Sequence, residues 1–115
     1  MERRGLASSD LHIQVVTRAI QQRKLLNVSD GEGGRTNVRA FEPHILFQTK
    51  DGNVVLGGYQ VNDSTRAGKP PVWHNIPVNK IGKVAASKER FIVRSGFNPN
   101  DQTKYYTVIV AAATP

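Results

Sequence analysis

Three segments between residues 38 and 84 decide the fold. They read Val-Arg-Ala-Phe-Glu-Pro (38–43), Asp-Gly-Asn-Val-Val-Leu-Gly-Gly-Tyr-Gln (51–60) and Trp-His-Asn-Ile-Pro-Val-Asn-Lys-Ile-Gly-Lys-Val (73–84). Their β-branched and aromatic residues favour strands. The turn Lys-Asp-Gly-Asn (50–53) predicts a hairpin between the first two segments. Pro43 and the pair Gly57-Gly58 predict bends or bulges inside the strands, which small barrels need.

The flanking sequence adds one helix and further strands. Ile13, Val16 and Ile20 recur with helical spacing, so we predict an amphipathic helix over 11–23 that Ser9 or Asp10 caps. Strands are predicted over 24–29, 37–49, 54–61, 72–85 and 104–112, and residues 91–95 form either a strand or the start of a helix. Residues 87–90 read as a charged connection and 97–101 as a turn. The fold class is therefore mainly β (α+β): an N-terminal helix followed by a small, strongly bent barrel of five or six strands.

Length and composition set outer limits. The 115 residues suit one domain, which we assign to 10–115 after a flexible N-terminus at 1–9. Because the chain has no cysteine, disulfides and thiolate chemistry are excluded, which fits a reducing cytoplasm. No apolar run approaches the roughly 20 residues that span a bilayer, and the first residues do not read as a secretory signal. We therefore expect a cytoplasmic protein without a membrane partner.

The chain is strongly basic. Sixteen lysines and arginines face nine acidic residues, which gives a formal charge of +7 and a pI near 10.2. A positive field concentrates polyanions, so a nucleotide or single-stranded nucleic acid is the partner that this charge favours. The alternative is that the charge serves solubility alone.

The order of these segments resembles the WYL-domain family. The resemblance covers roughly residues 11–86, with Arg39 and Pro43 in the family's Arg…Glu-Pro strand, Asp51-Gly52 and 56–59 in its hairpin, and 76–81 in its following strand. It implies an SH3/Sm-like barrel and a regulatory module that binds nucleic acid or a nucleotide-like effector. The chain departs from the family where Val54 and Val55 stand for its Trp-Tyr pair, where Pro77 stands for an arginine, and where Asn79-Lys80 replace its Asp-Arg pair.

Basic residues interleaved with aromatic ones form the candidate binding site. Cationic grooves with stackable rings are how single-stranded nucleic acids are bound without sequence preference. We expect cations to contact phosphate and rings to stack, and the candidate residues are Arg39, Lys80, Arg66, Lys69, Tyr59 and Trp73. The alternative is that the rings belong to the core and the charges to a solvated surface. If Arg39 faces inward, Glu42 or Asp63 is its expected ion-pair partner.

The sequence gives little sign of catalysis or of a metal. The three histidines have no metal-ligand spacing, the glycines at 31, 33 and 34 lack the lysine of a phosphate loop, and no nucleophile elbow is present. We therefore expect a non-enzymatic module without cofactor or metal. A second hypothesis is a protein-interaction or homo-oligomerisation module, because the apolar segment 104–112 is either buried on both faces or pairs with another chain.

Overall fold

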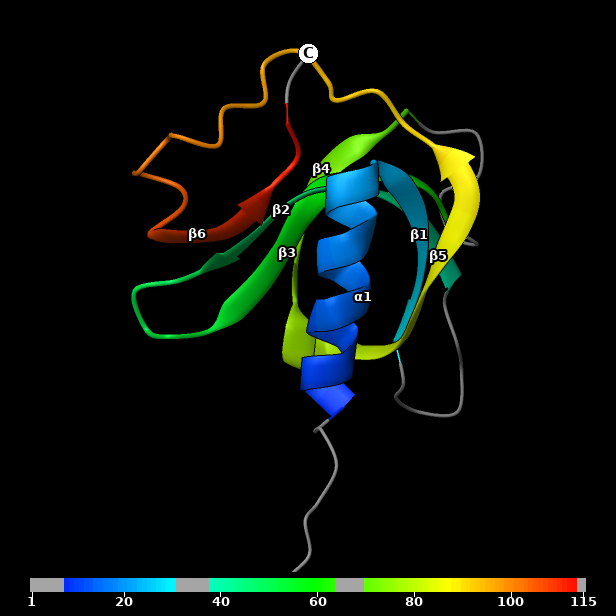
Figure 1. The fold of residues 1–115 in the computed structure, drawn as a ribbon, viewed down its shortest axis with the longest axis horizontal. Coiled ribbons are helices and arrows are strands. Elements are labelled where there is room, and N and C mark those ends of the chain that lie inside the picture. Colours follow the sequence, from blue (N-terminus) through cyan, green and yellow to red (C-terminus); the bar gives the residue numbers. More distant parts are fainter. Residues whose placement is uncertain (1–7, 31–37, 64–69, 114–115) are drawn as a thin grey trace, which may run out of the picture.

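The computed structural model describes residues 8–30, 38–63 and 70–113. It contains one helix, six strands and a short 3-10 turn (Figure 1). Their bounds are α1 Ser8–Gln22, β1 Lys24–Asp30, β2 Val38–Gln48, β3 Val54–Asp63, β4 Val72–Pro77, η1 Val78–Lys80, β5 Ile81–Arg90 and β6 Thr107–Ala111. The predicted N-terminal helix followed by a small, bent sheet is confirmed. No helix in the described ranges has both the length and the apolarity to cross a bilayer.

All strand pairs are antiparallel and belong to one sheet. Its order is β4-β3-β2-β1-β5, and β6 pairs with β2 off this path. Within the described residues the ladder does not close into a complete barrel, because no pairing joins β4 to β5. After Pro77 the chain passes instead through η1, whose three residues connect β4 at one edge of the sheet to β5 at the other edge.

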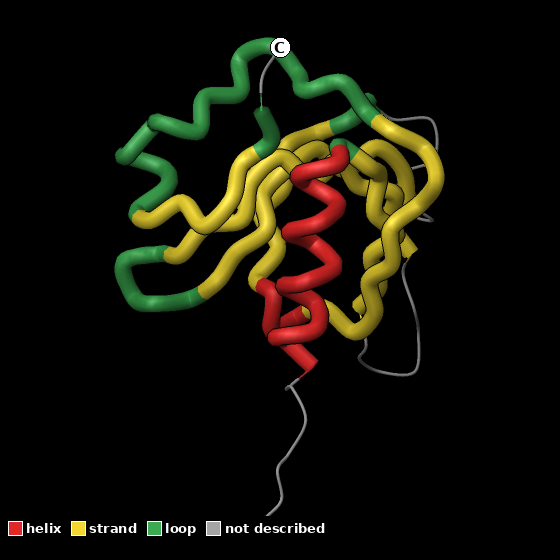
Figure 2. Tube along the Cα trace, viewed as in Figure 1, coloured by secondary structure: helices red, strands yellow, loops and turns green. Residues whose placement is uncertain are grey.

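The helix covers one face of this sheet (Figure 2). Val16, Ala19 and Ile20 are buried and belong to one core cluster with residues of β1 to β5 and of η1, and Val110 of β6 packs against this cluster. Arg23 has a φ of 56°, the left-handed conformation that commonly ends a helix. The helix begins at Ser8, so Asp10 lies inside its first turn and the predicted cap at Ser9 or Asp10 is wrong.

A second apolar cluster lies on the opposite face. Ile45 and Phe47 alternate along β2 with Leu46, which belongs to the helix-covered core, so they point the other way. They are covered by Phe97 and Tyr105 of the segment 91–106, here called the covering loop, which runs from β5 around to β6 (Figure 1). An irregular loop, and not a helix, therefore shields that face of the sheet.

Four expectations about this half of the chain need correction. Residues 87–90 belong to β5 and are not a connection, whereas 91–95 form neither strand nor helix. The last strand begins at Thr107 rather than at 104, and Val108 and Ile109 are 40% and 46% exposed. Burial on both faces is therefore wrong for β6, which leaves pairing with another chain as the open alternative.

Candidate binding site on the covered sheet face

A β-bulge in β2 lies at the centre of this face of the sheet. Pro43 pairs with Gly58 and Ile45 with Gly57, so His44 is an extra residue without a partner on β3. Proline has no N–H to give to a ladder, and bulges re-aim the side chain at the irregular position. His44 is fully buried, and its carbonyl oxygen accepts a hydrogen bond of 2.8 Å from the backbone N–H of Ala112.

The hydrogen bonds of His44 fix its tautomer. The backbone N–H of Arg94 donates to Nε2 over 3.1 Å, so Nδ1 carries the proton and donates to the carbonyl oxygen of Glu42 at 2.9 Å. Burial lowers the pKa of His44 below its ordinary 6.5. A second proton on Nε2 would also face the Arg94 N–H, so the buried ring is neutral.

An ion pair fastens the covering loop to β2. Arg94 Nε lies 2.7 Å from Glu42 Oε1 and Nη2 lies 3.0 Å from Oε2, a two-pronged geometry that is among the stronger ones in proteins. The Glu42 side chain is only 10% exposed, against 38% for Arg94. Hydrogen bonding to this carboxylate raises the pKa of Arg94. Glu42 therefore serves Arg94, which the sequence analysis did not single out, and not Arg39.

Aromatic rings surround His44. Tyr59, Trp73, Phe91 and Phe97 each place their ring centroid between 5.0 and 5.9 Å from that of His44. Tyr59 and Trp73 are register partners on β3 and β4, and their rings meet edge to face at 5.3 Å. One face of Tyr59 is taken by the Arg94 guanidinium at 4.9 Å, and Trp73 is stacked on Phe97 at 5.9 Å. These contacts hold both predicted stacking residues in fixed orientations.

A hollow of about 180 Å³ opens beside these rings. Its walls are the four rings of Tyr59, Trp73, Phe97 and Tyr105, and its remaining lining is Gly96, Asn98, Asp101 and Lys104. Drug-sized ligands usually occupy at least about 300 Å³, so this hollow has room for one planar ring system. Burial raises the pKa of the Tyr105 hydroxyl, which therefore stays protonated at neutral pH.

The polar lining is ordered by turns in the covering loop. Asn98 Oδ1 accepts from the Asn100 N–H at 3.0 Å, which leaves the Asn98 amide donors for other partners. Asp101 Oδ1 accepts from the hydroxyl and the N–H of Thr103 at 2.5 and 3.1 Å. The hydroxyl hydrogen bond lowers the pKa of Asp101, so its carboxylate is ionised. A donor, an acceptor and the Lys104 cation thus share one rim.

The six predicted site residues separate. Tyr59 and Trp73 meet at the hollow, whereas Arg66 and Lys69 lie outside the described residues. Arg39 pairs in register with Val28 and Asp63, three residues or about 10 Å of strand from Glu42. Lys80 is exposed at the end of η1, beyond the far end of β4 from Trp73. Neither Arg39 nor Lys80 lines the hollow; among the described residues, the cation that does is Lys104.

Reasoning from the sequence missed Arg94, Phe97 and Lys104. The turn over 97–101 was recognisable, because Asn98, Pro99, Asn100 and Asp101 are turn residues. Nothing local signalled that this turn folds back onto residues some fifty positions earlier. Within the described ranges, no three histidine or acidic side chains lie close enough together to hold a metal ion.

Comparison with protein-family models, curated proteins and solved structures finds no match to this chain.

His44 gives the fold a pH dependence with a definite sign. Its pKa is below 6.5 in the folded state, so the unfolded chain binds more protons between the two values and stability rises with pH there. Unfolding free energy should fall as the pH drops below 6.5, by at most about 1.4 kcal/mol per pH unit. Urea unfolding between pH 5 and 7 measures this slope. His44→Gln should flatten this slope; an unchanged slope in that variant would contradict the account.

Proposed function

We propose that this protein is a cytoplasmic, non-enzymatic module that binds the base of a nucleotide or of single-stranded nucleic acid in the hollow beside Tyr59 and Trp73. The observation that carries the proposal is the combination of an aromatic hollow of single-ring-system size with a cation, Lys104, on its rim. Rings recognise the base by stacking, at about 1–3 kcal/mol per base. The ammonium group of Lys104 would meet the phosphate.

The polar rim supports a base over a purely apolar ligand. The Asp101 carboxylate can accept and the Asn98 amide can donate, and the edge of a nucleobase offers both kinds of partner. The net charge of +7 attracts anionic ligands from a distance. The resemblance to the WYL-domain family, with its nucleic acid or nucleotide-like effectors, agrees with the same ligand class and with a regulatory role.

Trp73 is the chain's single tryptophan, so its fluorescence reports directly on the hollow. Titration with AMP, GMP, CMP, UMP and oligo(dT) should quench it saturably, with weaker binding at higher salt because phosphate contacts release counterions. Lys104→Gln should lower the affinity several-fold and reduce the salt slope by about one. Lys88→Gln, at an exposed lysine of β5, is the matched control and should change neither.

Calorimetry of the same titrations removes the effect of nucleotide absorbance on the fluorescence. Absence of binding into the millimolar range at low salt would overturn the proposal. Binding that inorganic phosphate reproduces equally well would also overturn it, because the hollow would then contribute nothing to recognition.

The exposed surface of β6 favours a second candidate, a protein-interaction or homodimerisation module. Tyr106, Val108 and Ile109 are between 40% and 64% exposed, and β6 pairs only with β2 among the described strands. Light scattering at high micromolar concentration separates the two functions. A dimer that Val108→Lys abolishes favours the second, and a monomer contradicts its homodimer form.

A further inference from the structure

The outer edge of β5 is open. β5 pairs with β1 on one side and ends the strand order, so no described strand pairs with its other side. Nearly all of its residues are half or fully exposed, Ile81 being the buried one. An unpaired strand edge presents a row of N–H and C=O groups that can hydrogen-bond to another extended chain.

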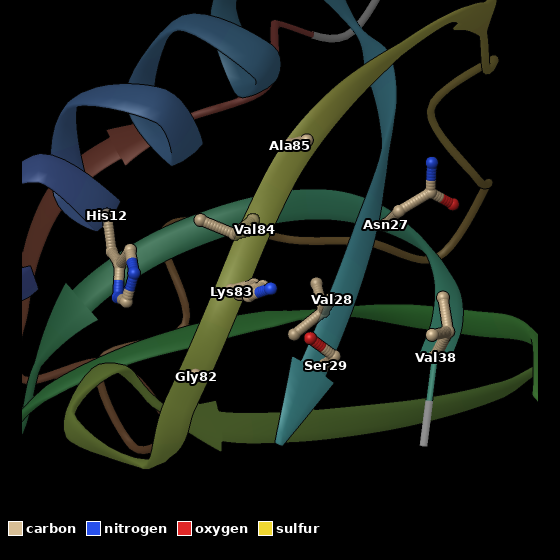
Figure 3. Close-up of a pocket in the computed structure, with 9 residues that line it drawn as sticks. All are labelled: His12, Asn27, Val28, Ser29, Val38, Gly82, Lys83, Val84 and Ala85. Carbon is tan, nitrogen blue, oxygen red and sulfur yellow. The ribbon is translucent and has the colours of Figure 1, made fainter. Parts of the chain in front are cut away.

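The helix lies beside this open edge. Figure 3 shows His12 of α1 on one side of β5 and Asn27 and Val28 of β1 on the other, with the Val84 side chain directed toward the helix side. α1 also contacts β5 directly. A chain added to the edge of β5 would therefore run beside α1, where one of its side chains could reach the helix.

Two hollows meet at residues 82–86 of this edge. One, of about 440 Å³, is lined by His12, by residues 82–85 and, on the paired side of β5, by residues 27–29 of β1 and Val38 of β2. The other, of about 430 Å³, lies between α1 and residues 84–86, with Val15 among its lining. Gly82, Ala85 and Ala86 have small or no side chains, so a backbone can approach closely. Farther along, the Ser87 hydroxyl accepts from the Glu89 N–H at 3.0 Å, which limits the free stretch to residues 82–86.

Charge decides what kind of chain fits. Arg18 and Lys24 line the second hollow and Lys83 lines the first. Lys88 and Arg90 extend the basic character along β5, and Glu89 is the single acidic residue of that strand. Like charges opposite each other on neighbouring strands are destabilising, so a basic segment is disfavoured here and an acidic one is favoured.

We propose that β5 takes an extended acidic peptide as an added strand along residues 82–86. Backbone hydrogen bonds to the open edge would supply affinity. Alternate side chains of the peptide would point to the two faces: apolar ones into the hollow at Val15 and Val84, where Arg18 and Lys24 also lie, and carboxylates toward Lys83 on the other face. This surface is separate from the aromatic hollow, so it can fail or succeed independently of the proposed nucleotide site.

The probe is an acetylated and amidated peptide of about eight residues that alternates glutamate and valine, long enough to cover the free stretch. Binding should protect amides within 82–86 from hydrogen exchange and shift their NMR signals together with those of α1. Lys83→Glu and Arg18→Glu should each weaken binding by roughly tenfold. Lys50→Glu, in the exposed β2–β3 turn, is the matched control and should weaken it much less.

Two further probes test strand addition rather than charge attraction. Two versions of the peptide are N-methylated on alternate residues, one on the odd positions and one on the even positions, so that each lacks the N–H donors along one of its edges. The version that lacks the donors facing β5 should lose binding. Equal binding of the two methylated peptides would overturn the proposal. Displacement of the unmethylated peptide by oligo(dT), with the hydrogen-exchange protection of residues 82–86 unchanged, would also overturn it. Protection of these amides without peptide that rises with protein concentration would assign the edge to a second copy and would also overturn it.

Discussion

Gly58→Ala is expected to be the most damaging single substitution in this chain. A Cβ at this position would lie 2.0 Å from the carbonyl oxygen of Glu42 and 2.8 Å from the Phe41 ring. The first obstacle is backbone, so no side-chain rotation relieves it, and the β2–β3 ladder must open at the bulge. We expect a loss of at least about 3 kcal/mol of unfolding free energy, in the upper range for over-packed sites. In thermal unfolding this corresponds to a drop of roughly 10 °C or more.

The displaced carbonyl also accepts the proton of His44 Nδ1, so the damage should reach the aromatic cluster and red-shift the emission of Trp73. Gly96→Ala is the matched control. Gly96 has a φ of 91°, but its Cβ would meet nothing within 4 Å, so only conformational strain of about 1 kcal/mol is expected. Equal losses in the two variants would contradict the close approach at the bulge.

Arg94→Met is expected to release the covering loop. Methionine keeps an unbranched apolar side chain but removes both hydrogen bonds to Glu42, whose carboxylate is nearly buried. Breaking a fully buried pair costs about 3–5 kcal/mol, and an exposed pair contributes at most about 1 kcal/mol. Because the arginine is partly exposed, we expect a loss of about 2 kcal/mol in urea unfolding.

The loop should respond more than the helix does. Amides of residues 94–105 should exchange faster, and Trp73 should shift to the red as Phe97 moves away from it. The double variant Glu42→Gln/Arg94→Met should recover part of the lost stability, because no buried carboxylate remains without a partner. A loss under about 0.5 kcal/mol with unchanged Trp73 emission would place this ion pair among surface contacts of no consequence.

Much of the fold was readable because its signals are local. Helical spacing predicted α1, and the turn at 50–53 predicted the β2–β3 hairpin, with Asn53 and Thr49 closing it through a backbone hydrogen bond of 2.8 Å. Pro43 and Gly57-Gly58 predicted an irregular strand pair, and the bulge lies at that point. Where local signals were weak, at residues 87–95, the boundaries were wrong, because β5 is held by its pairing with β1 and not by an apolar pattern of its own.

The candidate site was readable only in part. Tyr59 and Trp73 were identified because they are aromatic residues interleaved with basic ones along the predicted strands. The partnership of Glu42 with Arg94 spans 52 positions, and no periodicity links residues so far apart. Glu42 was expected, as one of two alternatives, to pair with Arg39 of the same strand, yet the arginine that reaches its carboxylate comes from the covering loop. Lys104 was not identified from the sequence, because only the path of the covering loop brings it close to the aromatic rings.

The proposed binding of a nucleotide in the hollow beside Tyr59 and Trp73 is tested most directly by NMR titration of the isotope-labelled protein with GMP and AMP, with inorganic phosphate as the reference. We predict that the nucleotides shift signals of Tyr59, Trp73, Phe97 and Lys104 together, with one dissociation constant, and that phosphate alone does not reproduce the aromatic shifts. Shifts confined to other basic residues such as Arg39 and Lys80, or none at millimolar nucleotide, would contradict the claim.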